Sequence, residues 1–323
     1  MTTDNERSKY VEHTGPNPIQ KTLKLSNIPS VLHVVVAITN PGKCEKKYQL
    51  ACECLKRLKD TPGVALYVVE LVYGDQEFQM TDAKMKRELQ MRTDVPLSHK
   101  ESMVNCAVAK LLPETWKYMA WIDADLEWSD TVNSTPNNWA TDALKVLQVC
   151  NIVQLFSHAI SMDAEGNAEA IHQGLAYQYV NKMKRDDGIN LYHPGFAWAC
   201  TREFYTKMGG LLEISVIECA EQQMASCWIG EKAFTILDER VTEGYKQSVQ
   251  AFADRCYPHA KLGYVPYTVT HHMHYALHNK VGRFVLDPET MLQHDDQGLI
   301  VPTATFPQNL IGVFAAQYSL NNL

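Results

Sequence analysis

The chain has 323 residues, of which 46% are hydrophobic and 21% are charged, with a formal net charge of -7. This size and composition suit one large folded unit with a full core, and they exclude a fibrous or wholly disordered chain. An acidic balance argues against tight, non-specific binding to nucleic acid. The local basic cluster is expected to be a solvated helix face; it consists of Lys84, Lys86, Arg87 and Arg92.

The cysteines and the apolar runs indicate the cellular compartment in which the protein is expected. There are nine cysteines, an odd number, and no C-x-x-C pair, which fits reduced thiols better than a disulfide or zinc framework. The first residues form no apolar signal core, and no apolar run approaches the roughly 18 residues that a membrane helix needs. We expect a soluble, cytoplasmic protein (in the host cell if it is viral) with no membrane partner. The oligomeric state is left open.

A polar arm is expected at residues 1–30, and regular secondary structure is expected after it. A continuous apolar run, 31–38, ends at turn residues and is typical of a buried parallel strand. Apolar residues in 44–58 recur at steps of three and four, which predicts an amphipathic helix. After Pro62-Gly63, a second strand is expected at 64–73. Strand, helix and strand at this length predict a right-handed crossover between parallel strands.

The alternation continues through the first half. We expect a helix at 100–112, a strand at 118–122, a helix at 138–147 and a strand at 149–156. This order predicts an α/β fold with a mostly parallel, Rossmann-like central sheet flanked by helices. In such sheets, ligands bind outside the carboxyl ends of the strands.

The second half is less regular. Residues 161–190 are polar and are expected to be loop with at most a short helix. Four further elements are expected: a strand or turn at 193–199, a short helix at 202–208, a helix within 236–256, and a strand at 264–270.

Asp123 and Asp125 flank one alanine directly after an apolar strand. Carboxylates at such a strand end suit a divalent cation or a ribose hydroxyl. A D-x-D triplet occurs about once by chance in a chain this long, so a solvated turn is an equal alternative on this ground alone.

Histidines cluster after the last predicted strand, at His271, His272, His274 and His278. Imidazole is a common ligand of transition metals. Taken alone, surface or core histidines satisfied by the backbone are the more common case. A carboxylate at one strand end and a histidine at another would, however, suffice to hold one cation.

Three further residues are candidates for chemistry. Glu221 lies between a helix that ends in glycines and an apolar helix, and either a general base or a carboxylate favoured by the helix dipole fits there. Lys100 opens a helix, a place that suits phosphate, although exposed lysines are common. Trp198 is suited to stack on a sugar, although tryptophan more often packs in cores.

Seven segments in order resemble one known group. Together they are similar to the GT-A fold glycosyltransferases related to family 2, and to the glycosyltransferases of tailed phages and related bacterial loci. The resemblance covers about residues 31–300. The matching segments are 66–75, 99–105, 121–125, 153–156, 193–199, 209–225 and 271–274.

The chain departs from this pattern in two places. The family's Gly-x-Gly-Asp appears here as Glu218-Cys219-Ala220-Glu221, so the expected base is a glutamate with a longer reach. In the His-aromatic-His-Gly ending, Met273 replaces the aromatic residue and Tyr275 the glycine. These two replacements affect how closely the acceptor or donor sugar can approach the loop at 271–275.

The resemblance implies a division into a nucleotide-sugar-binding half (31–157), an acceptor half of the same domain (158–290) and a tail (291–323). It implies a nucleotide-diphosphate sugar as donor and a Mn²⁺ or Mg²⁺ cofactor. By this resemblance, the donor is bound by Asn40, Glu70, Lys100 and Asp123, and the metal by Asp123, Asp125 and His271 or His274. Gly195 and Trp198 form a wall for the sugar or the acceptor. Glu221 is the catalytic base, and the sugar carbon is inverted.

Several alternatives remain open. Without Glu221 as base, a retaining mechanism is possible. A sugar nucleotidyltransferase is disfavoured because the first strand lacks a glycine-rich triphosphate loop. A non-catalytic carbohydrate- or DNA-binding protein is the third alternative. The acceptor is expected to be a glycan or a hydroxymethylated DNA base, which would have to be flipped out of a duplex.

Overall fold

The structure is a computed structural model of the full chain. It describes residues 31–129, 138–163, 165–183, 192–216, 220–231, 242–272, 286–307 and 311. Within these residues no helix is long and apolar enough to cross a membrane.

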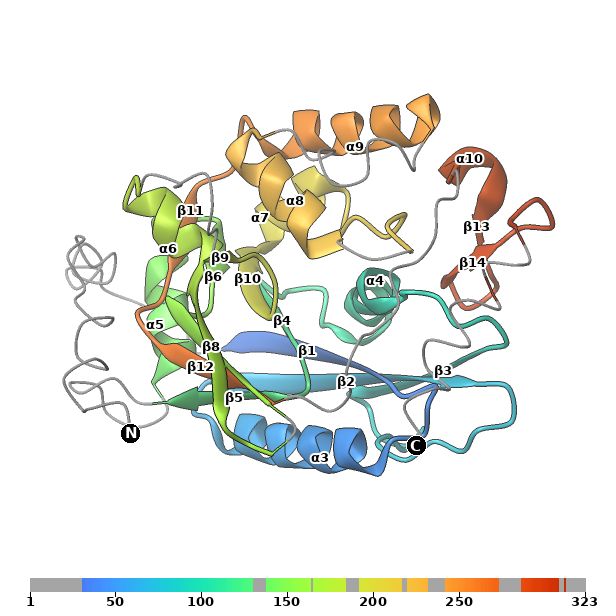
Figure 1. The fold of residues 1–323 in the computed structure, drawn as a ribbon, viewed down its shortest axis with the longest axis horizontal. Coiled ribbons are helices and arrows are strands. Elements are labelled where there is room, and N and C mark those ends of the chain that lie inside the picture. Colours follow the sequence, from blue (N-terminus) through green and yellow to red (C-terminus); the bar gives the residue numbers. More distant parts are fainter. Residues whose placement is uncertain are drawn as a thin grey trace.

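A seven-stranded sheet forms the centre of the molecule (Figure 1). Its order is β11-β6-β10-β4-β1-β2-β3. All neighbours are parallel except β10, which is antiparallel to both β4 and β6. The strands are β1 (Leu32–Thr39), β2 (Val64–Tyr73), β3 (Glu88–Thr93), β4 (Tyr118–Ile122), β6 (Ile152–Gln154), β10 (Ala197–Thr201) and β11 (Leu262–Tyr264). The predicted α/β class with a mostly parallel sheet is confirmed.

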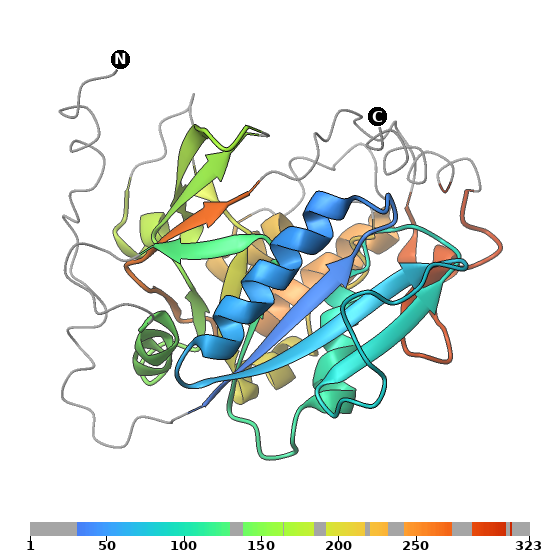
Figure 2. The ribbon, with the colours of Figure 1, turned by 90° about the horizontal axis from the view of Figure 1, so that it is seen from below.

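Helices cover both faces of this sheet. On one face, α3 (Glu45–Asp60) and α5 (Trp139–Val146) share an apolar core with β1 and β4, and Figure 2 shows α3 lying along β1. The buried residues of α3 fall at steps of three and four, as the sequence predicts. The other face carries α4 (Lys100–Leu111), α6 (Leu175–Val180), α7 (Arg202–Met208), α8 (Ala220–Ile229) and α9 (Glu243–Cys256).

A second sheet stands at the carboxyl edge of the first. Its order is β5-β12-β7-β8-β9, and the strands are β5 (Leu126–Ser129), β12 (Thr268–His271), β7 (His158–Met162), β8 (Ala168–Gly174) and β9 (Tyr192–His193). A small hairpin completes the described chain, with α10 (Pro288–Met291) followed by β13 (Leu292–His294) and β14 (Ile300–Pro302).

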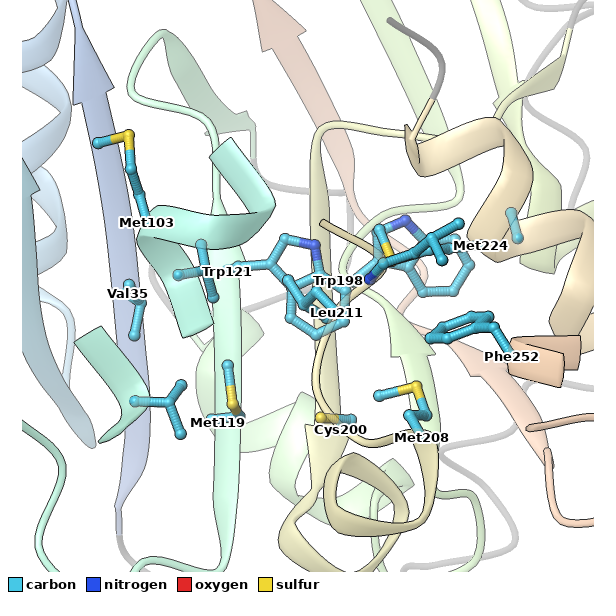
Figure 3. Packing of buried hydrophobic residues seen from close by; sticks show 14 of the residues in the cluster. Val35, Met103, Met119, Trp121, Trp198, Cys200, Met208, Leu211, Met224 and Phe252 are labelled. Atoms are coloured by element: carbon cyan, nitrogen blue, oxygen red, sulfur yellow. The ribbon is translucent and has the colours of Figure 1, made fainter. Parts of the chain in front are cut away.

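Aromatic and sulfur-containing side chains fill the core between the central sheet and α8 and α9 (Figure 3). Trp121 and Trp198 lie side by side on β4 and β10. Both meet Trp228 of α8 edge-on, at ring-centroid distances of 6.3 and 4.8 Å. All three indoles are 1% exposed. This packing fixes α8, and therefore the residues of its first turn, against the sheet.

Several predicted elements differ from the structure. The basic cluster is no helix face, because residues 83–87 form turns and Arg92 lies in β3. Arg92 is held there by the carbonyls of Gly74 and Gln76, the latter at 2.9 Å. The strand expected at 149–156 is shortened to β6, since α5 and its closing turn extend to residue 149.

The segment 161–190 was expected to be loop with at most a short helix, and α6 is such a helix. The described part also contains the end of β7 and all of β8, which were not expected. Only a few of these side chains are buried, so the strands lack an apolar signal. The strand expected at 264–270 is two strands in different sheets, β11 and β12. Pro266, which has no N–H to donate to a ladder, lies between them. Of the helix expected within 236–256, α9 begins at Glu243, and residues 236–241 lie outside the described residues.

Candidate active site

Asp123 and Asp125 lie in the turn that joins β4 to β5. The strand ahead of them is buried in the sheet, so its end is fixed, and the Asp123 N–H donates to the Phe196 carbonyl at 2.9 Å. The two side chains are 25% and 13% exposed. The turn therefore presents both carboxylates at the carboxyl edge of the sheet, where ligands bind in such folds.

The pairing of β12 with β5 brings His271 to this turn across a long stretch of sequence. In this antiparallel register His271 stands opposite Leu126, and the His272 N–H donates to the Asp125 carbonyl at 3.2 Å. The His271 Nε2 atom lies 3.4 Å from Asp125 Oδ2. Burial alone would lower the pKa of His271, but the hydrogen bond and charge of Asp125 outweigh it and raise the pKa.

Lys100, the first residue of α4, joins two other candidate residues. Its ammonium group forms ion pairs with Asp123 Oδ1 and with Glu221 Oε1. The three side chains are each about one quarter exposed. Burial would lower the pKa of Lys100, but the two carboxylates outweigh it and raise the pKa. Lys100 therefore remains cationic between two acids.

Glu221 lies in the first turn of α8 and reaches over Gly195. A Cβ atom added to Gly195 would meet Glu221 Oε2 and lie 2.9 Å from Glu221 Cδ. Burial would raise the pKa of Glu221, yet the charge and hydrogen bond of Lys100 outweigh it and hold the pKa below its usual range. Glu221 is therefore an ionised carboxylate that lies against the backbone of Gly195, which has no side chain.

Three aromatic rings connect the Glu221 side of the site to the Asp125 side. Phe196 stacks on His193 at a centroid distance of 3.6 Å and on His271 at 4.5 Å. Its φ angle of 74° is in the left-handed region, which is uncommon for a residue with a side chain. Such backbone strain persists only where the surroundings enforce it. The stack fixes the His271 ring, and burial lowers the pKa of His193 to about 4.

A cavity of about 250 Å³ opens beside the carboxylates. Its walls come from the end of β1, from α3, from the start of α4, from the β4–β5 turn and from β12. The residues that carry charge or can gain it are Lys47, His99, Lys100, Asp123, Asp125 and His271. Most of the predicted site residues that the structure describes therefore line this space or, like Glu221, lie against Lys100 at its rim.

Three residues of the site, Asp123, Asp125 and His271, are of types that bind cations. Among the described residues, no three His, Cys, Asp or Glu side chains are grouped so that they could hold a metal ion by themselves. Asp125 and His271 are nonetheless side by side, and Asp123 is in the same turn. Carboxylate and imidazole donors suit Mn²⁺, and a bound diphosphate would supply further oxygens. The donor set therefore fits a cation shared with a ligand, while His274 lies outside the described residues.

Asn40 and Glu70 lie near the cavity but are not part of its wall. The Asn40 side chain closes the turn after β1, with hydrogen bonds of 2.9 and 3.0 Å to the backbone of Cys44. Glu70 is 1% exposed and accepts hydrogen bonds from the N–H groups of Gln79 and Met80 and from the Thr81 hydroxyl. Both residues shape the loops at the carboxyl ends of β1 and β2.

Trp198 is a correction to the predicted sugar wall. Its ring is 1% exposed and packs on Trp228, and its N–H donates to the Pro194 carbonyl at 2.7 Å. It lies on β10 with its neighbours in the sheet on either side, so no face of the indole is open to a ligand. Gly195, three residues earlier, does reach the site, against Glu221. Glu218 and Tyr275 lie outside the described residues.

The sequence interpretation missed three site residues: Lys47, Glu101 and His193. Glu101 is 4% exposed, and burial raises its pKa to about 8. Lys47 had a detectable signal, because it precedes Ala51 by four residues and therefore lies on the inward face of α3. His193 lies in the matching segment 193–199, but nothing local singled out its side chain, since the antiparallel insertion of β10 carries that segment to the site.

Comparison with known proteins gives only structural matches. No family model matches the sequence, and no curated protein is similar to it by sequence. Among solved structures, it is similar to a mannosyltransferase from Pyrobaculum calidifontis in complex with GDP-Man and Mn²⁺ (14% identity, TM-score 0.34, covering 65% of this chain and 57% of that one). It is also similar to a Drosophila β1,4-galactosyltransferase 7 mutant with manganese, UDP-Gal and xylobiose (12%, 0.31, 60% and 60%).

A third match is glucosyl-3-phosphoglycerate synthase from Mycobacterium tuberculosis in complex with Mn²⁺, UDP-glucose and phosphoglyceric acid (13% identity, TM-score 0.33, covering 78% of this chain and 73% of that one). The chain spans less than two thirds of the length of the first two matched proteins. At these TM-scores and identities, the matches assign no function to this chain.

Proposed function

We propose that the protein is a glycosyltransferase that moves a sugar from a nucleotide-diphosphate donor to an acceptor hydroxyl, with a divalent cation as cofactor. One observation carries the proposal. Asp125 with His271, a pair suited to a metal, and Lys100 with Glu221, a cation paired with a candidate base, meet at Asp123 on one edge of the sheet.

In this proposal Asp125, His271 and Asp123 would hold Mn²⁺ or Mg²⁺ together with the donor. When bound, the cation would offset the negative charge that develops on the diphosphate leaving group. Lys100 binds the diphosphate at the start of α4, where backbone N–H groups also favour anions. Asn40 and Glu70 serve the nucleotide indirectly, because their hydrogen bonds shape the loops above β1 and β2.

Glu221 is proposed to accept the proton of the acceptor hydroxyl, which gives inversion at the sugar carbon. Lys100 lowers the pKa of Glu221, so the carboxylate is ionised. It would become a stronger base once the ammonium group moves away. Lys100 pairs with Glu221 in the structure. The ammonium group therefore has to move toward the donor before the base can act, so the donor binds before the acceptor.

The test is release of nucleoside diphosphate from a panel of UDP- and GDP-sugars with Mn²⁺, with glycans and hydroxymethylated DNA as acceptors. We expect Glu221→Gln to lower transfer by about 10² or more, the usual contribution of a general base, with donor binding intact. Asp125→Asn should abolish the Mn²⁺ response. Glu243→Gln is the control, since that side chain on α9 is 81% exposed. Retained activity and retained Mn²⁺ response in Asp125→Asn would overturn the proposal.

A further inference from the structure

His193 is an imidazole next to the proposed base, Glu221. A Cβ atom added to Gly195 would lie 2.9 Å from Glu221 Cδ and 3.2 Å from His193 Cε1, so the two side chains flank the same point. The His193 ring is held in place, because it stacks on Phe196 at a centroid distance of 3.6 Å and an interplanar angle of 8°. It belongs to β9, whereas Glu221 comes from α8. The second sheet therefore supplies a fixed imidazole beside the base.

The hydrogen bond of the His193 ring decides which of its nitrogens carries the proton. The Gly195 N–H donates to Nδ1 at 3.1 Å, so Nδ1 is an acceptor and has no proton. Burial lowers the pKa of His193 to about 4, so the ring is neutral near pH 7 and its one N–H is at Nε2. Nε2 has no hydrogen-bond partner within the described part of the chain, and it is not enclosed by protein. The Nε2–H group is therefore a donor that is open to a ligand.

His193 lies outside the cavity that is assigned to the donor. Lys100, Asp123 and Asp125 line that cavity, and neither His193 nor Gly195 is part of its wall. A general base lies within hydrogen-bond reach of the hydroxyl that it deprotonates. An acceptor bound at Glu221 therefore comes next to His193 as well. Because the imidazole is neutral, it suits an uncharged oxygen of that acceptor better than a phosphate.

We propose that His193 binds the acceptor, and that its Nε2–H group donates a hydrogen bond to the oxygen adjacent to the hydroxyl that Glu221 deprotonates. The inference rests on the proposed function, and it names the class of acceptor: a sugar with two neighbouring oxygens. A hydrogen bond to the attacking oxygen itself would make that oxygen a weaker nucleophile, so the neighbouring oxygen is the productive partner. In hydroxymethylcytosine the neighbouring group is the N4 amine, which is itself a donor and does not fit.

The experiment measures transfer from the best UDP- or GDP-sugar to methyl glycosides of glucose, galactose, mannose and N-acetylglucosamine, each compared with its monodeoxy analogues. For wild type, we expect the analogue without the neighbouring hydroxyl to lose about tenfold in kcat/KM, the cost of one hydrogen bond. His193→Asn keeps an acceptor for the Gly195 N–H but has no group at the place of Nε2. It should lose the same factor with the parent glycoside and no longer distinguish parent from analogue. His193→Gln, whose amide N–H can reach the place of Nε2, should recover most of the distinction. His259→Asn is the matched control, because His259 is exposed.

A tenfold distinction that persists in His193→Asn would overturn the inference, because an equal loss with both glycosides means that His193 only supports the fold. If His193→Asn does not fold, wild type alone decides, since equal kcat/KM for a glycoside and all its deoxy analogues would overturn the inference. Transfer to none of the glycosides would also overturn it, and transfer to hydroxymethylcytosine DNA in that case would leave the proposed function standing. Failure of the proposed function is distinct, because wild type would then release no nucleoside diphosphate from any donor with any acceptor.

Discussion

Gly195 lacks a side chain at the point where Glu221 needs the space. The backbone of residues 193–197 passes directly beneath the carboxylate, and it is held there by Gln154, whose amide donates to the His193 carbonyl at 2.9 Å. Neither this backbone nor the Glu221 side chain can shift easily, because Glu221 is also paired with Lys100. At the residue scale, the position of the proposed base depends on a missing methyl group.

We expect Gly195→Ala to lower sugar transfer by about 10²-fold, because a displacement of about 1 Å in a catalytic group can cost that much. Nucleoside diphosphate binding should be unchanged, since Gly195 is not part of the cavity wall. Steady-state transfer and calorimetric binding measure the two effects. Gly244→Ala is the control, because its added Cβ would lie 3.4 Å from the nearest atom. Wild-type transfer in Gly195→Ala would contradict the expected collision.

The register of β12 and the loop after β2 position the groups of the site. The register of β12 on β5 decides that His271 faces Asp125, because a shift of one residue would send its side chain to the other face of the sheet. The loop after β2 is fixed by a buried acid, since Glu70 receives three hydrogen bonds from residues 79–81. A charged acceptor with three donors is a strong local anchor.

We expect Glu70→Gln to lower the free energy of unfolding by about 3 kcal/mol, because its amide would turn a donor toward donors in a buried place. Urea denaturation measures this loss. Limited proteolysis should cut the loop at 79–81 faster than in wild type. Glu77→Gln is the matched control, since Glu77 lies in the same loop and is exposed. A Glu70→Gln protein as stable as wild type would show that the loop is anchored elsewhere.

At the scale of the whole molecule, α4 joins the site to the C-terminal hairpin. The Ile300 N–H donates to Ser102 Oγ at 2.9 Å, and the Cys106 thiol contacts the Gly298 carbonyl. His99, the residue before α4, is 1% exposed and bonds through Nε2 to the Val95 carbonyl at 3.0 Å. Burial lowers the pKa of His99. The neutral imidazole is therefore part of the folded state.

Because the folded-state pKa of His99 is below the unfolded value of 6.5, its contribution is present above pH 6.5 and is lost as pH falls through the folded pKa. We expect the free energy of unfolding of wild type to fall more steeply with acid than that of His99→Gln, which cannot titrate. Urea denaturation at a series of pH values below 6.5 measures the two slopes. Equal slopes would mean that His99 is protonated in the folded state as easily as in the unfolded one.

The sequence alone determined the elements whose signal is local. The continuous apolar runs became β1, β2 and β4, and the spacing of apolar residues marked α3. The end of α4 follows from Pro113, which cannot continue a helix. Asp123, Asp125 and Lys100 were found in the same way, because they directly follow or begin such elements. Polar strands such as β8 were not predicted, since only a few of their side chains are buried and they show no apolar pattern.

Only the tertiary structure decided which residues meet. The insertion of β10 between β4 and β6 puts His193, Gly195 and Phe196 against Glu221 and Asp123. It also buries Trp198, which was predicted from the sequence to form a wall of the sugar site. The pairing of β12 with β5 joins His271 to Asp125, and the packing of α3 turns Lys47 into the cavity. These contacts depend on strand order and register, which long-range packing sets and no local period encodes.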